Sequence, residues 1–260
     1  MSDERDWDLF KQKLKVKTGI DLNEYKANQM QRRITNLMTR HSHKSYVEFF
    51  SSIENDKKAF ADFIEYLTIN VSEFFRTPEK FSELEAKVIP DLLSKSPKLN
   101  IWSAGCSIGA EPYSLAMILK DMTPSAKHRI LATDLDVEIL NKARAGVYTI
   151  NEIKNISTQR KNSYFKNEDD KYTVLDDIKS RIEFKRHNLL LDSFETGIDL
   201  ILCRNVVIYF TEEAKDKLYR RFFAALKPGG VLFVGGTEAI LNFRDIGFVS
   251  YLPFFYRKPF

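Results

Sequence analysis

Cysteine, histidine and tryptophan are scarce in this chain of 260 residues, which contains two, four and two of them. Two cysteines, Cys106 and Cys203, cannot build a disulfide framework, and we expect both to be small buried residues rather than reactive thiols. The histidines follow no metal-ligand spacing, so we expect no metal site at His41, His43, His128 or His187.

Long apolar runs are also missing. No segment approaches the roughly 18 consecutive apolar residues that a membrane-spanning helix needs, and residues 1–7 lack the apolar core of a signal peptide. We therefore expect a cytoplasmic protein that does not insert into a membrane. Internal repeats are not evident, and a hydrophobic content of 43% is ample for one large α/β domain and a small helical one.

Acidic residues are missing from one segment near the N-terminus, although the whole chain has a net charge of only +4. Residues 26–45 contain five basic residues and no acidic ones: Lys26, Arg32, Arg33, Arg40 and Lys44. Apolar residues at helical spacing mark one side of this segment, which leaves Arg32, Arg33 and Arg40 on its other sides. Such a basic helix attracts acidic partners, and the alternative is an ordinary solvated helix face.

A strand, a glycine turn and a helix start are predicted between Leu99 and Leu119. Gly105 and Gly109 have no Cβ, so the backbone can turn sharply there and approach a ligand closely. The spacing is not the dinucleotide pattern G-x-G-x-x-G, and Glu111 stands where a pyrophosphate needs neutral or basic surroundings. S-adenosylmethionine fits better, because its ribose hydroxyls seek a carboxylate and its sulfonium is repelled by Lys or Arg.

A second acidic residue ends the next predicted strand, Arg129–Asp134. At the tip of the neighbouring strand, the Asp134 carboxylate is placed to accept hydrogen bonds from two ribose hydroxyls. A loop cap is the alternative role for this residue taken alone, but the nearby glycine turn favours ligand binding.

Five motifs carry a resemblance that covers essentially the whole chain. They are Thr68–Arg76, Trp102–Ser114, Ala132–Asp136, His187–Leu190 and Cys203–Phe210. In order and spacing they resemble the chemotaxis receptor glutamate methyltransferases, the CheR family. Two departures are visible, because Gly105 stands where the family often has alanine and Ile108-Gly109-Ala110 replaces Thr-Gly-Glu. Glu111 is retained, so neither change affects the expected cofactor.

The resemblance implies a small N-terminal all-α helical domain, residues 1–70, followed by a Rossmann-like S-adenosylmethionine methyltransferase domain, residues 71–260. Alternating strand and helix signals predict the same α/β class, with a mostly parallel sheet and one antiparallel strand in a closing hairpin at residues 247–258. Four helices are expected in the N-terminal domain, and the fourth begins at Asp56.

Two local predictions concern the second half of the chain. Residues 172–175 and 181–185 alternate around an acidic turn, which predicts short antiparallel strands in a small β insertion at about residues 164–187. A helix capped by Thr211 is expected to bury Leu226 and to end at Lys227-Pro-Gly-Gly230.

The resemblance also implies the site residues. Those expected to line the cofactor are Asn70, Ser72, Arg76, Gly105, Glu111, Asp134, Asn188, Leu189, Arg204 and Asn205. Arg76 and Tyr209 are the expected catalytic residues, since a guanidinium grips a carboxylate through two parallel bonds and a phenol can orient it. A surface salt bridge for Arg76 and a core position for Tyr209 are the alternatives that spacing alone leaves open.

The implied reaction moves a methyl group from S-adenosylmethionine to glutamate carboxylates of chemoreceptors and leaves S-adenosylhomocysteine. A glutamate with a pKa of about 4.3 is already a nucleophile at neutral pH, so the absence of a Cys-His or Ser-His-Asp arrangement fits this reaction. The implied partner is the cytoplasmic helical region of transmembrane chemoreceptors, docked on Arg32, Arg33 and Arg40. We expect a monomer that does not bind nucleic acid.

Three other functions stay open at this point: a nucleic-acid methyltransferase, a small-molecule methyltransferase, and a non-catalytic signalling adaptor that binds S-adenosylmethionine. The loop after Cys203 lacks the Pro-Pro-aromatic pattern of enzymes that methylate exocyclic amines. The presence of Arg76 and Tyr209 argues against the adaptor.

Overall fold

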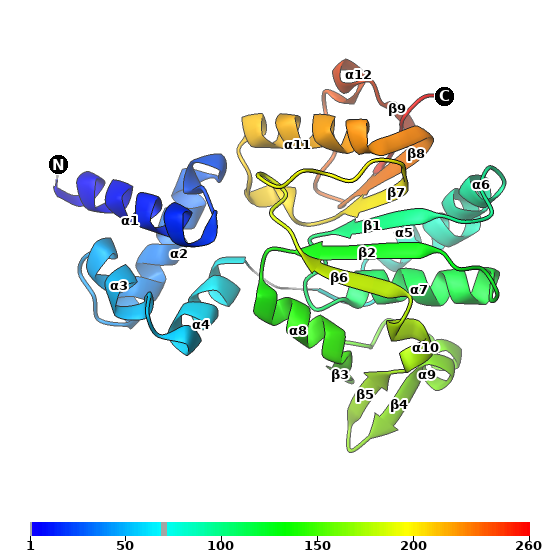
Figure 1. Ribbon diagram of the computed structural model, residues 1–260, viewed down its shortest axis with the longest axis horizontal. Coiled ribbons are helices and arrows are strands. Elements are labelled where there is room, and N and C mark those ends of the chain that lie inside the picture. Colours follow the sequence, from blue (N-terminus) through cyan, green and yellow to red (C-terminus); the bar gives the residue numbers. More distant parts are fainter. Residues whose placement is uncertain (1, 69–71) are drawn as a thin grey trace. The chain divides into compact units, whose positions relative to one another are not determined.

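A computed structural model describes residues 2–68 and 72–260 of the chain (Figure 1). The described residues fall into two compact units: residues 2–68 with 206–218 form the helical unit, and residues 72–205 with 219–260 form the sheet unit. No helix in these described ranges combines the length and the apolar character that crossing a membrane requires.

Four helices make up most of the helical unit: α1 (Ser2–Thr18), α2 (Ala27–Arg40), α3 (Tyr46–Ile53) and α4 (Lys57–Thr68). Side-chain caps set two of the starts, because Ser45 accepts from the N–H of Glu48 and Asp56 accepts from that of Lys58. The prediction of four helices is confirmed. Two 3₁₀ turns and the start of a longer helix complete the unit: η1 (Leu22–Glu24), η3 (Val207–Tyr209) and α11 (Glu212–Ala225).

A seven-stranded sheet in the order β6-β2-β1-β7-β8-β10-β9 forms the centre of the sheet unit. Its strands are β1 (Asn100–Ala104), β2 (Arg129–Asp134), β6 (Ile182–Arg186), β7 (Ile198–Cys203), β8 (Leu226–Val234), β9 (Val249–Leu252) and β10 (Phe255–Arg257). The strands from β6 to β8 pair in parallel, whereas β10 is antiparallel to β8 and β9. The predicted sheet and closing hairpin are confirmed. The strand order reverses between β1 and β7, and open α/β sheets bind ligands at the carboxyl ends beside such a point.

Alternate residues of the central strands face two helical layers. On one face Ile101, Leu200 and Phe233 belong to a core shared with five helical segments: α5 (Pro78–Glu83), the π-helical η2 (Leu84–Val88), α6 (Ile89–Leu93), α7 (Ala110–Met122) and α8 (Val137–Ala145). On the other face Trp102 packs against Phe222 of α11, with ring centroids 5.5 Å apart. Burial on both faces explains why these strands are continuous apolar runs.

A second, antiparallel sheet has the order β3-β5-β4. Its strands and adjoining helices are β3 (Val147–Thr149), β4 (Phe165–Glu168), β5 (Lys171–Val174), α9 (Thr158–Tyr164) and α10 (Asp176–Lys179). The expected pairing of residues 172–175 with 181–185 is wrong: β5 pairs with β3 and β4, whereas β6 joins the main sheet parallel to β2. The acidic turn between them is the helix α10, which its buried Ile178 anchors, so the chain changes sheets there.

The predicted end of α11 also needs correction. The helix ends at Ala225, because Leu226 already pairs with Ile198 as the first residue of β8. The segment Lys227–Gly230 is therefore part of a long strand rather than a helix terminus. A short helix, α12 (Phe243–Ile246), then precedes the closing hairpin.

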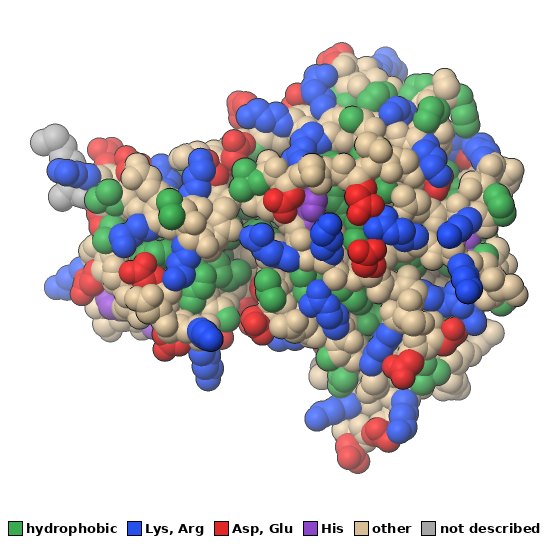
Figure 2. Space-filling view, in the orientation of Figure 1, with side chains coloured by type: hydrophobic (Ala, Val, Ile, Leu, Met, Phe, Trp, Pro, Cys, Tyr) green, Lys and Arg blue, Asp and Glu red, His purple; other side chains and the backbone are tan. Residues whose placement is uncertain are grey.

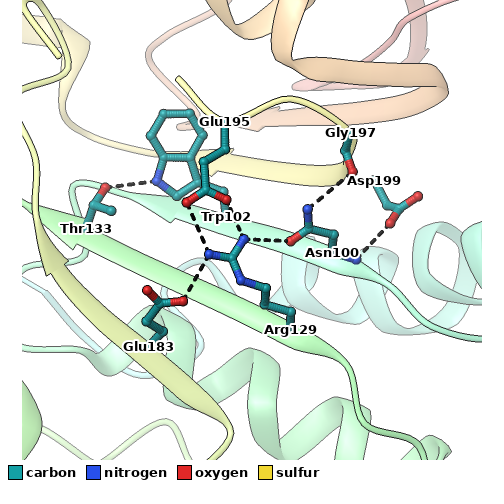
Figure 3. A network of polar contacts seen from close by, with 8 residues as sticks. All are labelled: Asn100, Trp102, Arg129, Thr133, Glu183, Glu195, Gly197 and Asp199. Carbon is teal, nitrogen blue, oxygen red and sulfur yellow. Dashed lines mark hydrogen bonds and ion pairs between the residues drawn. The ribbon is translucent and has the colours of Figure 1, made fainter. Parts of the chain in front are cut away.

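Polar side chains hold together the amino edge of the main sheet (Figure 3). Arg129, at the start of β2, donates to Glu195 at 2.6 and 3.1 Å and to Glu183 at 2.9 Å. It also donates to the Asn100 side chain at 3.3 Å, and the backbone N–H of Asn100 donates to Asp199 at 2.7 Å. Figure 2 shows acidic and basic side chains interspersed over the face in front of β1, β2 and β6.

Candidate functional site

The loop after β1 is tied to β2 at the carboxyl edge of the sheet. The N–H groups of Gly105 and Cys106 both donate to the carbonyl of Thr133, at 2.8 and 2.9 Å. The loop ends at Gly109, which has a φ of +86° and directly precedes α7. A Cβ at Gly109 would lie 3.0 Å from the Cβ of Ala143, so glycine is required there both for its φ and for space.

Asp134 ends β2 and is almost fully buried, with 9% of its surface exposed. Its two oxygens accept from the N–H of Ser107 at 2.8 Å and from that of Asp136 at 3.1 Å. Burial raises the pKa of Asp134 to about 6, although these N–H groups oppose the shift. The predicted acidic group at the strand tip is therefore a buried carboxyl held against the glycine loop.

Glu111 and Arg204 form a buried ion pair at the same edge. Ser103 donates to one Glu111 oxygen at 2.7 Å, and Arg204 lies 3.4 Å from the other. Burial raises the pKa of Glu111 and lowers that of Arg204, and in each the charge of the partner opposes the shift. Because desolvation outweighs the pairing in both groups, the site holds these charges at an energetic cost.

Arg204 also fixes the segment that contains Arg76. It follows β7 and donates to the carbonyl of Arg76 at 2.7 Å and to the Thr77 hydroxyl at 3.2 Å. The Arg76 side chain is half-buried, and its positive charge is near enough to lower the pKa of Glu111 and of Arg204. The structure thus brings Arg76, Arg204 and Glu111 together.

Backbone strain is concentrated in these segments. Eight non-glycine residues in the described ranges have a left-handed φ, and four of them lie at this edge: Phe75, Thr77, Ser107 and Asn205, with φ between 48° and 63°. Residues held in such conformations cluster at functional sites, where the surrounding structure compensates for the strain.

Three buried polar side-chain atoms at this edge have no hydrogen-bond partner among the described residues, and one of them is the Nε2 of His187, which directly follows β6. The other two belong to residues described above. They are the Ser107 hydroxyl oxygen and the Nε of Arg204. Native proteins rarely leave such atoms unpaired, and a polar ligand would satisfy them. The free cysteines Cys106 and Cys203 are buried close by, and burial raises the pKa of both thiols well above the usual range, as expected for unreactive residues.

Asn188 and Leu189 lie in a tight loop after β6. The Asn188 side chain accepts from the N–H of Leu190 at 3.0 Å, so it caps its own turn. Both residues are buried, and Arg221 of α11 donates to the Leu189 carbonyl at 2.5 Å. Asn70 lies outside the described residues, and Ser72 is half-buried ahead of the Arg76 segment.

The remaining predicted residues belong to the helical unit. Tyr209 is half-buried, and its carbonyl accepts from the N–H of Lys26 at 2.9 Å. Arg32 and Arg40 are exposed on α2. Arg33 instead donates to the Tyr66 carbonyl and stacks 4.5 Å over that ring, so its guanidinium is used within the unit.

Sequence reasoning missed Glu238. It is buried in the turn after β8 and accepts hydrogen bonds from two backbone N–H groups, those of Asn205 and Gly235. The sequence does contain a signal for Glu238: it is an acidic residue four positions after a buried strand, just beyond two adjacent glycines. This pattern resembles the glycines and the acidic residue that follow β1.

Two family models match this chain: "CheR methyltransferase, SAM binding domain" over residues 70–250 and "CheR methyltransferase, all-alpha domain" over residues 5–68. The chain belongs to the CheR methyltransferase family. The "Chemotaxis protein methyltransferase" of Listeria monocytogenes is 43% identical over 98% of both chains. A protein of that name from Borreliella burgdorferi is 33% identical over 92% of this chain and 89% of its own length. "Chemotaxis protein methyltransferase 1" of Pseudomonas aeruginosa is 35% identical over 92% of each chain.

This membership confirms the predicted family and its cofactor, S-adenosylmethionine. The carboxyl edge of this CheR methyltransferase fits that cofactor, because it offers two carboxyl groups, a glycine loop and unpaired buried polar atoms. When bound, S-adenosylmethionine supplies an electrophilic methyl group. Among the described residues no group of three or more His, Cys, Asp or Glu side chains is arranged to hold a metal ion.

Proposed function

We propose that this CheR methyltransferase esterifies glutamate side chains of chemoreceptors with the methyl group of S-adenosylmethionine. The observation that carries the proposal is Arg76, a cation held between two left-handed residues at the edge that contains Glu111 and Asp134. A guanidinium beside the cofactor edge suits an anionic acceptor such as a carboxylate.

We propose that the cofactor is held by the residues of this edge. Asp134 accepts hydrogen bonds from the ribose hydroxyls, and Glu111 gives the negative charge that suits a sulfonium. Ser107 and Arg204 supply the unpaired polar atoms. The remaining proposed contacts, from the family pattern, are Asn70, Ser72, Gly105, Asn188, Leu189 and Asn205.

The acceptor needs positioning rather than activation. A glutamate is ionised at neutral pH and needs no general base, so most of the rate comes from holding its oxygen in line with the methyl group. In this proposal Arg76 grips the carboxylate and Tyr209 orients it through its hydroxyl. Exclusion of water from the site strengthens the contacts of Arg76 and Tyr209 with the carboxylate.

Docking is assigned to the basic side of α2. Arg32 and Arg40 are exposed there and attract the acidic, helical cytoplasmic region of a chemoreceptor. Arg33 contributes by fixing α2 to α4, because its guanidinium is occupied by Tyr66. We further propose that the protein works in the cytoplasm as a monomer, and that the boundary between its two domains in the sequence follows residue 70.

A transfer assay tests this function. Incubation with methyl-labelled S-adenosylmethionine and chemoreceptor-rich membranes should place label on the receptor, and mild base should release it, as a carboxyl ester requires. Arg76→Ala should lower kcat/KM about 100-fold, and Tyr209→Phe should lower kcat about ten-fold with unchanged affinity for S-adenosylhomocysteine, from the usual energies of charged and neutral hydrogen bonds. Label in RNA or DNA instead of receptor, or parent rates in both variants, would contradict the proposal.

The same assay tests docking. Reversing the charge of Arg32 and Arg40 to Glu should raise the KM for receptor without changing affinity for S-adenosylhomocysteine, and added salt should have the same effect on the parent protein. Lys57 and Lys58 are exposed in the first turn of α4, so the double reversal there is a control of equal charge change. If both reversals raised the KM for receptor equally, the effect would come from the net charge of the protein and not from docking on α2.

A further inference from the structure

We infer that Glu238 is a positioning residue for the cofactor site, acting through the backbone of Asn205. The turn that contains it starts directly after β8, whose last residue is Val234. The N–H of Glu238 donates to the carbonyl of Gly235 at 2.9 Å, which closes a four-residue turn. This turn directs the side chain of Glu238 back toward the end of β7, and only 5% of the residue is exposed.

One oxygen of Glu238 serves two strands. Its Oε2 accepts from the N–H of Asn205 at 2.5 Å and from the N–H of Gly235 at 2.9 Å. The last paired residues of β7 and β8 are Cys203 and Val234, so both donors lie just beyond the ladder, where no strand partner is available. The carboxylate therefore continues the pairing of the two strands at the cofactor edge.

Gly235 makes this contact possible. A Cβ on Gly235 would lie 2.3 Å from the Glu238 Oε2 and 3.0 Å from the Asn205 nitrogen, so any side chain there would displace the carboxylate. A Cβ on the neighbouring Gly236 would meet nothing within 4 Å. The two adjacent glycines therefore differ: the first leaves space for Glu238, and the second has no such role.

The contact fixes a strained residue that follows Arg204. Asn205 has a φ of +59°, and its N–H points to Glu238 in that conformation. Arg204, directly before it, reaches Glu111 and the Arg76 carbonyl. Holding Asn205 therefore sets the direction in which Arg204 leaves the strand. The inference rests on the proposed function to the extent that Arg204 and Asn205 contact the cofactor.

Asp199 provides a matched comparison at the opposite edge of the sheet. Like Glu238 it is a buried carboxylate, 6% exposed, and it accepts from a backbone N–H, that of Asn100 at 2.7 Å. It also accepts from Lys227 at 2.7 Å. Loss of either carboxylate leaves backbone N–H donors that are at least partly buried without their partner, so both losses should destabilise the fold. Only the loss of Glu238 should alter the cofactor site.

The experiment measures binding of S-adenosylhomocysteine to the full chain by calorimetry, together with thermal unfolding and the kinetics for S-adenosylmethionine. Glu238→Ala should raise the Kd at least ten-fold. Glu238→Gln should stay within about three-fold of the parent, because its amide oxygen can accept the same two bonds. Gly235→Ala should behave like Glu238→Ala, whereas Gly236→Ala should not alter the Kd. Asp199→Ala should lower the unfolding temperature and leave the Kd and the KM for S-adenosylmethionine unchanged.

Two results would overturn the inference. One is an equal change in Kd for Glu238→Ala and Asp199→Ala, since Glu238 would then act only on stability. The other is a parent-like Kd for both Glu238→Ala and Gly235→Ala. If Glu238→Ala does not fold, Gly235→Ala and Glu238→Gln decide. Asn205→Ala tests the proposed cofactor contact separately, because it removes the side chain and keeps the backbone N–H that donates to Glu238. If it weakens binding while Glu238→Ala does not, only the inference fails. If it leaves the Kd unchanged while Glu238→Ala raises it, only the proposed contact of the Asn205 side chain fails.

Discussion

The polar groups at the two edges of the main sheet differ in how completely they are paired. At the amino edge Arg129 is shared by Glu183, Glu195 and Asn100, and it is more than one-third exposed (Figure 3). There each charge meets an opposite charge, and water screens the pair. Such a network holds the starts of the strands in place, and its charged groups need no further partner.

The carboxyl edge leaves its polar groups partly unsatisfied. Burial raises the pKa of Glu111 and of Asp134, and the Ser107 hydroxyl and the Arg204 Nε are buried without a partner among the described residues. Left-handed residues occur in the same segments. The amino edge therefore contributes stability, whereas the carboxyl edge has unpaired polar groups that a bound ligand can satisfy. This is expected because open α/β sheets bind their ligands at the carboxyl edge.

Removing the central arginine of each edge should give the largest contrast. Arg204→Met leaves the Glu111 carboxyl buried without its cation, which should cost about 3–5 kcal/mol of folding free energy and weaken S-adenosylhomocysteine binding more than about 100-fold. Arg129→Met breaks partly exposed pairs, so it should cost about 1 kcal/mol or less and leave binding unchanged. Urea unfolding and calorimetry on the two variants check this.

A double variant tests whether the unpaired Glu111 carboxyl causes the loss of stability. Adding Glu111→Gln to Arg204→Met removes both buried charges, so stability should return in part while affinity stays low. Equal losses of affinity for Arg204→Met and Arg129→Met would mean that the two edges do not differ in function.

The next contrast is in pH dependence. Because folding raises the pKa of Asp134 from 3.8 to about 6, the contribution of this group to stability is complete below pH 3.8 and is lost as the pH rises through about 6. Ligand binding has the opposite sign, since ribose hydroxyls need the carboxylate as acceptor. Affinity for S-adenosylhomocysteine should therefore fall about ten-fold from pH 7 to pH 5, and calorimetry across this range measures it.

Two variants assign the titration. Asp134→Asn should remove this pH dependence and weaken binding at pH 7.5 by about 1.5–3 kcal/mol, the usual loss for a charged hydrogen bond. At the amino edge, Arg129 lowers the pKa of Glu195, which stays ionised throughout, so Glu195→Gln should keep the parent pH profile. A flat profile in the parent protein would remove Asp134 from the site.

Local signals made much of this fold predictable. Helical spacing and the caps at Ser45 and Asp56 define two helices of the helical unit, and Gly105 and Gly109 mark the loop after β1 because a left-handed φ favours glycine. Asp134 was predictable because a strand tip is fixed by its own strand.

The sequence did not predict in the same way with which distant strand or side chain a residue pairs. Alternation within residues 181–185 indicates a strand but not whether it pairs with β5 or with β2, since pairing depends on distant segments. The charge of Arg33 suggested an exposed residue, yet Tyr66 of another helix takes up its guanidinium. Glu238 acts on Asn205 across 33 positions, which no local pattern encodes.

The smallest expected effect is the most specific to the carboxyl edge. Ser107→Ala removes a buried hydroxyl oxygen that has no partner among the described residues, so folding stability should stay within about 0.5 kcal/mol of the parent or rise. Affinity for S-adenosylhomocysteine should nevertheless fall about three- to ten-fold, because the hydroxyl pairs only when the ligand is present. Asn100→Ala at the amino edge should do the reverse: its amide donates to Gly197 and accepts from Arg129, so stability should fall by about 1–3 kcal/mol while affinity stays at the parent value. Urea unfolding and calorimetry on both variants decide the matter, since a loss of stability without a loss of affinity in Ser107→Ala would make the unpaired hydroxyl a structural element and not part of a ligand site.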